Sequence, residues 1–176
     1  MLNYTDFDAS AAFDCVLAGL SIATCERVGL PRIAGLFMYN LLHNMKFHLI
    51  TGFGQSSSFY INDTDGITGQ GVLQGSSFAA PIFLLNSDVS LTASKKLGTG
   101  ATFKHPITKA EVCEHAVQFV DDTSQYTNKG GIAQLEKETE PISDDTLVKH
   151  ALKTSQIWAD MLWVSGGNLN LDKCYY

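Results

Sequence analysis

The chain has 176 residues, 45% of them apolar, which is enough for one domain with a hydrophobic core. Its longest apolar stretch, Ala79 to Leu85, is far shorter than the roughly 20 residues that span a bilayer, and the N-terminus carries no secretory signal, so no membrane partner is expected. The net charge of −6 argues against nucleic-acid binding by this chain alone, because neutralising phosphates needs a surplus of Lys and Arg.

The cysteines indicate the compartment. No two of them form a C-x-x-C pair, and none has a histidine at zinc-finger spacing. We therefore expect reduced thiols and an intracellular location, in the nucleus or the cytoplasm. The four residues are Cys15, Cys25, Cys113 and Cys174.

The first half of the chain reads as strands and helices separated by turns. A strand is expected over Leu2–Phe7, then a helix from about Ser10 to Val28 and a second helix from Pro31 to about Asn44. On the second helix one side is apolar, with Ile33, Phe37, Leu41 and Met45. The segments that follow are strands at Phe47–Thr51 and Phe59–Ile61, a turn at Asn62–Gly66, a glycine-rich loop at Gly69–Gly75 and a helix from Ser77 to about Thr92.

The second half indicates a hairpin. Two short strands, Ala116–Val120 and Ser124–Thr127, flank Asp121-Asp122 at the bend, and Lys129–Pro141 reads as a solvated loop with a short helical turn. Ser143 is a good N-cap for a helix that ends at Gly166-Gly167, and a final strand follows from Asn168 to Tyr176. The expected fold class is α+β, an antiparallel sheet with helices packed on one face.

Carboxylates occur at two places where a plain surface would not need them. Asp8 comes at the end of the first strand, and Asp121-Asp122 follow the apolar Phe119-Val. Adjacent acids in a tight bend repel one another unless cations neutralise them, and Mg²⁺ prefers one or two carboxylates together with phosphate oxygens. The ordinary alternatives are a turn for Asp-Asp and a helix N-cap for Asp8, and spacing does not decide between these readings.

The ordered combination is more specific than its parts, and it resembles the palm motifs of reverse transcriptases, particularly those of retroelements. Along the chain stand Asp8-x4-Phe13-Asp14, then Leu73-Gln74-Gly75 with Pro81-Ile-Phe83, then Phe119-Val-Asp121-Asp122, and finally Ser165-Gly-Gly-Asn with Lys173-Cys174. The resemblance covers nearly the whole chain. It implies a polymerase palm, with residues 1–176 forming a partial reverse transcriptase domain that lacks fingers and thumb.

The resemblance also implies roles for the acids and for one aromatic residue. Asp8 and Asp121 match the acids that bind both metal ions, and Asp122 matches the second acid of the Asp-Asp box, which supports the site. Phe13 matches the aromatic steric gate beneath the sugar of the incoming nucleotide, while core packing is the plain alternative.

Three more residues match motifs that contact the nucleotide. Gln74 and Gly75 match the loop that meets the incoming nucleotide and the template, where the alternative is a simple turn. Lys173 matches the lysine of the late palm motif, which assists the pyrophosphate side of the reaction, where the alternative is a solvated surface lysine.

The function implied by the resemblance is RNA-directed DNA polymerisation, a nucleotidyl transfer to a primer 3′-hydroxyl assisted by two Mg²⁺ or Mn²⁺ ions about 4 Å apart. The implied partners are an RNA or DNA template with its primer and deoxynucleotide triphosphates. The rival reading is a catalytically inactive retroelement remnant with at most a binding or structural role. An intact set of Asp8, Asp121 and Asp122 keeps the chemistry possible.

Other enzyme classes fit less well. Gly69-Gln-Gly71-Val-Leu-Gln-Gly75 imitates a dinucleotide fingerprint, but it follows a turn rather than a hydrophobic strand. The five histidines are scattered without metal-site spacing, and no Gly-x-Ser-x-Gly elbow marks a hydrolase.

Overall fold

The computed structural model describes residues 1–10, 12–61, 71–72, 76–137 and 141–175. The chain divides into two compact units. The first unit combines Met1–Ala12 with Ser87–Tyr176, and the second is Phe13–Asn86.

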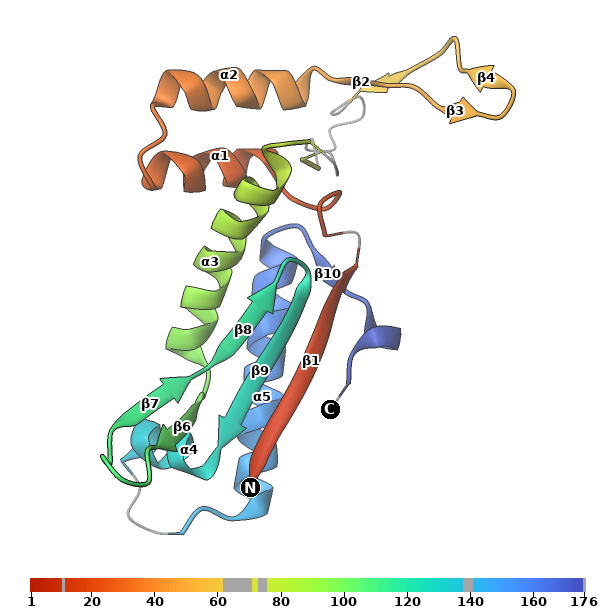
Figure 1. Ribbon diagram of the computed structural model, residues 1–176. Coiled ribbons are helices and arrows are strands. Elements are labelled where there is room, and N and C mark those ends of the chain that lie inside the picture. Colours follow the sequence, from red (N-terminus) through yellow and green to blue (C-terminus); the bar gives the residue numbers. More distant parts are fainter. Residues whose placement is uncertain (11, 62–70, 73–75, 138–140, 176) are drawn as a thin grey trace. The chain divides into compact units, whose positions relative to one another are not determined.

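The first unit is built on a four-stranded antiparallel sheet in the order β10-β1-β9-β8 (Figure 1). Strand β1 pairs with β9 along nearly its whole length, from Leu2 opposite Asn128 to Asp8 opposite Asp122. The sheet therefore joins the start of the chain to segments far along the sequence. The strands are β1 (Leu2–Ser10), β8 (Ala116–Phe119), β9 (Asp122–Asn128) and β10 (Asn168–Leu169).

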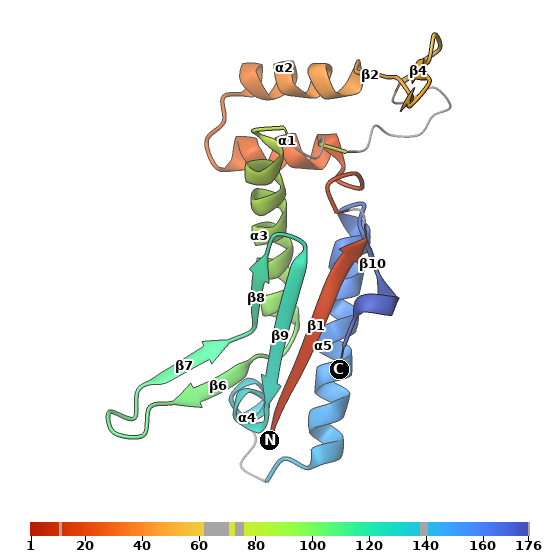
Figure 2. The same ribbon diagram turned by 45° about the vertical axis from the view of Figure 1, so that its right-hand side comes forward.

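The two faces of this sheet differ because side chains alternate along each strand. Helix α5 (Asp144–Val164) packs on one face, where it contacts β1 and β9 and lies behind them in Figure 1; Figure 2 shows it from the side of β1. The buried side chains of this layer are Thr5, Phe7 and Ala9 of β1, Thr123, Gln125 and Thr127 of β9, and Leu147, Ala151, Trp158 and Leu162 of α5. The other face of β1 and β9 carries polar side chains. The expected α+β class, with an antiparallel sheet and packed helices, is confirmed.

The expected start of the last long helix is also confirmed. The Ser143 side chain accepts a hydrogen bond from the Thr146 backbone N–H at 3.1 Å, which satisfies one free donor of the first turn. The final strand is shorter than expected, because β10 ends at Leu169 and a 3-10 helix, η1 (Leu171–Lys173), follows.

After β9 a solvated loop with a short helical turn was expected, and the structure instead has the eight-residue helix α4 at Lys129–Glu136. The Asn128 side chain caps this helix by accepting from the Gly131 N–H at 2.8 Å, and the helix buries the side chain of its own Ile132 completely. A Cβ at position 131 would overlap the Gly100 carbonyl, so the glycine that weakens the helix signal in the sequence is what lets α4 approach residue 100.

A further hairpin was not expected from the sequence. Strands β6 (Ala101–Lys104) and β7 (Glu111–Glu114) pair antiparallel, and Lys104 Nζ lies 2.8 Å from Glu111 Oε1 across them. In both views this hairpin lies at the other end of the sheet from the β8–β9 turn (Figures 1 and 2).

The second unit contains two packed helices and short strands. Its elements are α1 (Ala18–Arg27), α2 (Arg32–His43), the pair β2 (Lys46–Phe47) with β5 (Tyr60–Ile61), the pair β3 (Ile50–Thr51) with β4 (Gly54–Gln55), and the start of α3 (Ala79–Leu97), which continues into the first unit. The first helix begins at Ala18 rather than at Ser10, because β1 extends to Ser10. No helix that the structure describes is long and apolar enough to cross a membrane.

Candidate functional site

The first feature of the site is a pair of acids that oppose each other across the sheet. Asp8, near the end of β1, and Asp122, the first residue of β9, are direct cross-strand partners. Residues paired in this way have Cα atoms about 4.5–5.5 Å apart in antiparallel sheets. Like charges directly opposite one another destabilise a sheet, so this end of the sheet favours a bound cation.

The turn that follows β8 brings the third acid to the same end. Phe119 pairs with Asp122, so Val120 and Asp121 form a two-residue turn. Val120 has a φ of 57°, a conformation that β-branched residues seldom adopt, and its carbonyl accepts from Gln118 Nε2 at 2.7 Å. The Asp121 carbonyl accepts from the Ala9 N–H at 3.4 Å, which places the turn against the end of β1.

A lysine approaches Asp8 from the other edge of β1. The Asn170 N–H donates to the Asp8 carbonyl at 2.9 Å, and the following turn of η1 carries Lys173. Lys173 Nζ lies 3.7 Å from Asp8 Oδ2, with the lysine side chain 64% exposed and the aspartate side chain 16% exposed. The structure thus brings together Asp8, Asp121, Asp122 and Lys173 of the residues expected from the motifs.

Asp8 and Asp122 border a hollow of about 350 Å³ on the polar face of the sheet. Asp6 also lines it, a residue that the motif comparison did not select, although its position two residues before Asp8 puts both side chains on one face of a strand. The lining residues are Tyr4, Asp6, Phe7, Asp8, Asp122, Thr123, Ser124, Lys173 and Tyr175. Asp121 is not among them, because it belongs to the turn.

A short hydrogen-bond chain extends from Asp6 along this face. Ser124 Oγ donates to Asp6 Oδ1 at 2.6 Å, and the Tyr4 hydroxyl lies 3.2 Å from Ser124 Oγ. Hydrogen bonding to the Asp6 carboxylate raises the pKa of Tyr4, against an opposing effect of Ser124. Asp6 is therefore engaged by neighbouring hydroxyls, whereas Asp8 has the Lys173 ammonium group 3.7 Å away.

The carboxylates at this end of the sheet suit a hard cation to which the protein supplies only some of the ligands. Among the residues that the structure describes, no group of three or more His, Cys, Asp or Glu side chains is close enough to hold a metal ion. Mg²⁺ commonly takes one or two carboxylates and fills its remaining positions with water or phosphate oxygens. Two opposed aspartates with a third in the adjoining turn fit that requirement, and they do not resemble a closed structural metal site.

The remaining motif residues belong to the second unit. The Phe13 and Phe83 rings lie 5.0 Å apart, and the Phe13 carbonyl accepts from the Val72 N–H at 3.0 Å. The chain around Gly71 and the Pro81-Ile-Phe83 segment therefore meet near Phe13. Phe83 is a packing partner of Phe13, as expected if Phe13 is a core residue rather than a steric gate. Gln74 and Gly75 lie outside the residues that the structure describes.

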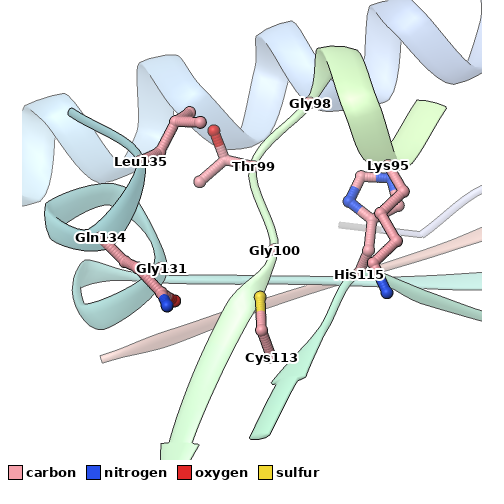
Figure 3. A pocket seen from close by; sticks show the side chains of 9 residues that line it. All are labelled: Lys95, Gly98, Thr99, Gly100, Cys113, His115, Gly131, Gln134 and Leu135. Carbon is pink, nitrogen blue, oxygen red and sulfur yellow. The ribbon is translucent and has the colours of Figure 1, made fainter. Parts of the chain in front are cut away.

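A second hollow of the first unit, about 290 Å³, is explained by packing (Figure 3). His115 on its wall is buried, its Nε2 lies 2.9 Å from Ser94 Oγ, and burial, with a smaller effect of Lys95, lowers the pKa of its imidazole. Thr99 Oγ1 lies 3.0 Å from His150 Nδ1. His115 and Thr99 are thus hydrogen-bonded to other side chains of the fold, and we assign them a structural role.

Comparisons with known proteins bear on the fold. No protein-family model matches the sequence, and no curated protein matches it significantly. Among solved structures, telomerase from Candida tropicalis in complex with the TWJ fragment of telomeric RNA aligns with a TM-score of 0.56 and 14% identity, over 99% of this chain and 25% of that one. The apo telomerase gives 0.57 and 15% over 99% and 28%, and its form truncated from the C-terminal domain gives 0.54 and 18% over 99% and 30%.

The fold of this chain is similar to that of part of these telomerase structures. Identities this low support the fold alone, and this chain spans less than a third of each telomerase chain. The expected antiparallel sheet with packed helices therefore agrees with the structural similarity to these chains. The roles of individual residues require a separate argument.

Proposed function

We propose that this chain is the palm portion of a reverse transcriptase of retroelement type, an RNA-directed DNA polymerase. The observation that carries the proposal is the register of β1 against β9, which opposes Asp8 to Asp122 and sets the Asp121 turn against the end of β1. Acids from two remote segments meet at the end of a sheet whose fold is that of a polymerase related to reverse transcriptases.

Asp8 and Asp121 would hold two Mg²⁺ or Mn²⁺ ions, and Asp122 would support them. When bound, such ions act as Lewis acids toward the attacking hydroxyl and the leaving oxygen of a phosphoryl transfer. The chain would contribute position, because paired strands and a two-residue turn hold the backbone of these acids at one end of the sheet. The ions also supply positive charge that an acidic chain needs next to nucleic acid.

The other motif residues would bind the substrate. Phe13, Gln74 and Gly75 would contact the nucleotide, and Lys173 would interact with its phosphates. The partners would be an RNA or DNA template with its primer and deoxynucleotide triphosphates, in the nucleus or cytoplasm. The solved telomerase complex with telomeric RNA supports a nucleic-acid partner only by analogy of fold.

The test is primer extension on a homopolymer RNA template with Mg²⁺ or Mn²⁺, using this chain joined to reverse-transcriptase fingers and thumb. Asp121→Asn should abolish extension while leaving thermal unfolding largely unchanged. Asp145→Asn is the matched control, because it makes the same change of charge in the exposed first turn of α5 and should extend primers as the parent does.

The outcomes separate the two readings of the chain. Extension by Asp121→Asn at the parent rate would refute the role of this acid. No extension by the parent, with either ion, would favour an inactive retroelement remnant with a binding or structural role.

A further inference from the structure

The position of Lys173 beside Asp8 is fixed by backbone contacts on both sides. Before it, the Asn170 N–H donates to the Asp8 carbonyl at 2.9 Å. After it, Tyr175 and Asp6 exchange two backbone hydrogen bonds of 2.9 and 3.0 Å. The segment between them is the single turn η1, so Lys173 is held at the outer edge of β1 next to Asp8.

The charges around this lysine are unbalanced. Three carboxylates line the hollow, those of Asp6, Asp8 and Asp122, and Lys173 is the one basic side chain among its described lining residues. Asp6 accepts from Ser124, while Asp8 has the Lys173 ammonium at 3.7 Å. The Lys173 ammonium group thus lies next to the Asp8 carboxylate, which a metal ion would need as a ligand.

We propose that Lys173 is a displaceable counter-ion of Asp8, so that its ammonium group and a divalent cation compete for the same carboxylate. This inference rests on the proposed function, because it concerns the same metal-binding acid. A Mg²⁺ ion on Asp8 would sit about 2.0–2.1 Å from a carboxylate oxygen, and an ammonium group left at its present distance would be strongly repelled.

The lysine can move away without disturbing the fold. Its side chain is 64% exposed, its four-carbon stem is flexible, and its backbone stays tied to β1 through Asn170 and Tyr175. A released ammonium group therefore remains within one side-chain length of Asp8. There it can interact with phosphate oxygens held by the ion, which couples metal binding to substrate binding.

The test is a Mn²⁺ titration of the full chain at fixed ionic strength, with free Mn²⁺ followed by electron paramagnetic resonance. Lys173→Met should bind Mn²⁺ about two- to fivefold more tightly than the wild type, the range expected for loss of a partly exposed ion pair. Lys173→Arg retains the positive charge and should bind as the wild type does. Thermal unfolding of each variant checks that the fold is intact.

The matched control is Lys104→Met. It changes the net charge by the same amount and removes another lysine–carboxylate ion pair, that of Lys104 with Glu111, at the other end of the sheet (Figure 1). Equal tightening by Lys104→Met and Lys173→Met would overturn the inference, since only net charge would then matter.

Failure of the inference and failure of the proposed function give different results. If Asp8→Asn abolishes Mn²⁺ binding and Lys173→Met leaves it unchanged, the metal site stands and the competition does not. If the wild type binds no Mn²⁺, or Asp8→Asn binds it equally well, the metal site itself is absent and both proposals fall.

Discussion

Asp8 of β1 and Asp122 of β9 are direct cross-strand partners, so two carboxylates oppose each other where the sheet ends in the Val120–Asp121 turn. In a metal-free chain this arrangement costs folding free energy, because like charges directly opposite destabilise a sheet. An uncharged pair at positions 8 and 122 would make the folded state more stable. Two acids at these positions therefore indicate a function other than stabilising the fold.

The first prediction concerns that cost. Without metal, Asp122→Asn should raise the free energy of unfolding by about 0.2–1 kcal/mol, measured by urea denaturation at low salt. In an Asp8→Asn background the same change should have no stabilising effect, because the opposing charge is gone. An equal gain in both backgrounds would show that the two carboxylates do not interact.

A second prediction concerns the turn. Val120 has a φ of 57°, which costs a non-glycine residue roughly 1–2 kcal/mol, and a β-branched residue is especially unsuited to it. Val120→Gly should therefore stabilise the chain by about 1 kcal/mol or less, since glycine also gains freedom in the unfolded state. Val117→Gly, in the extended strand β8, is the control and should destabilise. A loss of stability with Val120→Gly would mean that the Val120 side chain contributes more than its backbone strain costs.

A third prediction follows from His115. Burial, with a smaller effect of Lys95, lowers the pKa of its imidazole, and a backbone interaction with Thr99 partly opposes this. Because the unfolded chain takes up this proton first, stability should fall as the pH drops below about 6.5 toward the lowered pKa of the folded state. Asp88, Lys95 and Glu114 line a neighbouring hollow together with His115.

The measurement is the midpoint of thermal unfolding between pH 7.5 and 5. His115→Gln removes the titrating ring, so its curve should be flatter than that of the wild type. His43→Gln, at a partly exposed position on α2, is the control for the loss of a histidine. Identical slopes in His115→Gln and the wild type would assign the acid sensitivity to other groups.

The sequence predicted the parts of the fold that local signals specify. The Asp-Asp bend between two short strand candidates is a local hairpin signal, and Ser143 is a local cap. Both the β8–β9 hairpin and α5 appear where these signals put them. Helix α4 was missed because its capping contact from Asn128 and its close approach to Gly100 depend on the assembled fold, while Lys129-Gly-Gly is a poor helix sequence. The apolar side of α2 was recognised, yet Ile33 is 85% exposed and Phe37 is 68% exposed, because periodicity marks a face without saying what covers it.

The sequence predicted which residues belong to the candidate site, but not which of them lie opposite one another across the sheet. Motif order selected Asp8, Asp121, Asp122 and Lys173, but strand register decides which of two adjacent acids opposes Asp8, and register is a property of the whole sheet. The place of Lys173 next to Asp8 likewise depends on how the last residues of the chain run along β1.

The last prediction separates the two roles weighed for Phe13. Its ring lies 5.0 Å from that of Phe83 at an interplanar angle of 39°, an arrangement worth about 0.5–1.5 kcal/mol beyond area burial. A double-mutant cycle with Phe13→Leu and Phe83→Leu, read by urea denaturation, should give a coupling energy in that range. A steric gate makes a different demand, because shortening its side chain should relax discrimination against a 2′-hydroxyl.

The two measurements are independent, since one follows unfolding and the other follows ribonucleotide incorporation by the chain completed with fingers and thumb. Phe83→Leu is the control for the second, because it disturbs the same ring pair from the partner side. If Phe13→Leu relaxes sugar discrimination and Phe83→Leu does not, Phe13 contacts the nucleotide in addition to packing. If both leave discrimination unchanged while the coupling energy is present, Phe13 serves the core of the second unit and the gate assignment is wrong.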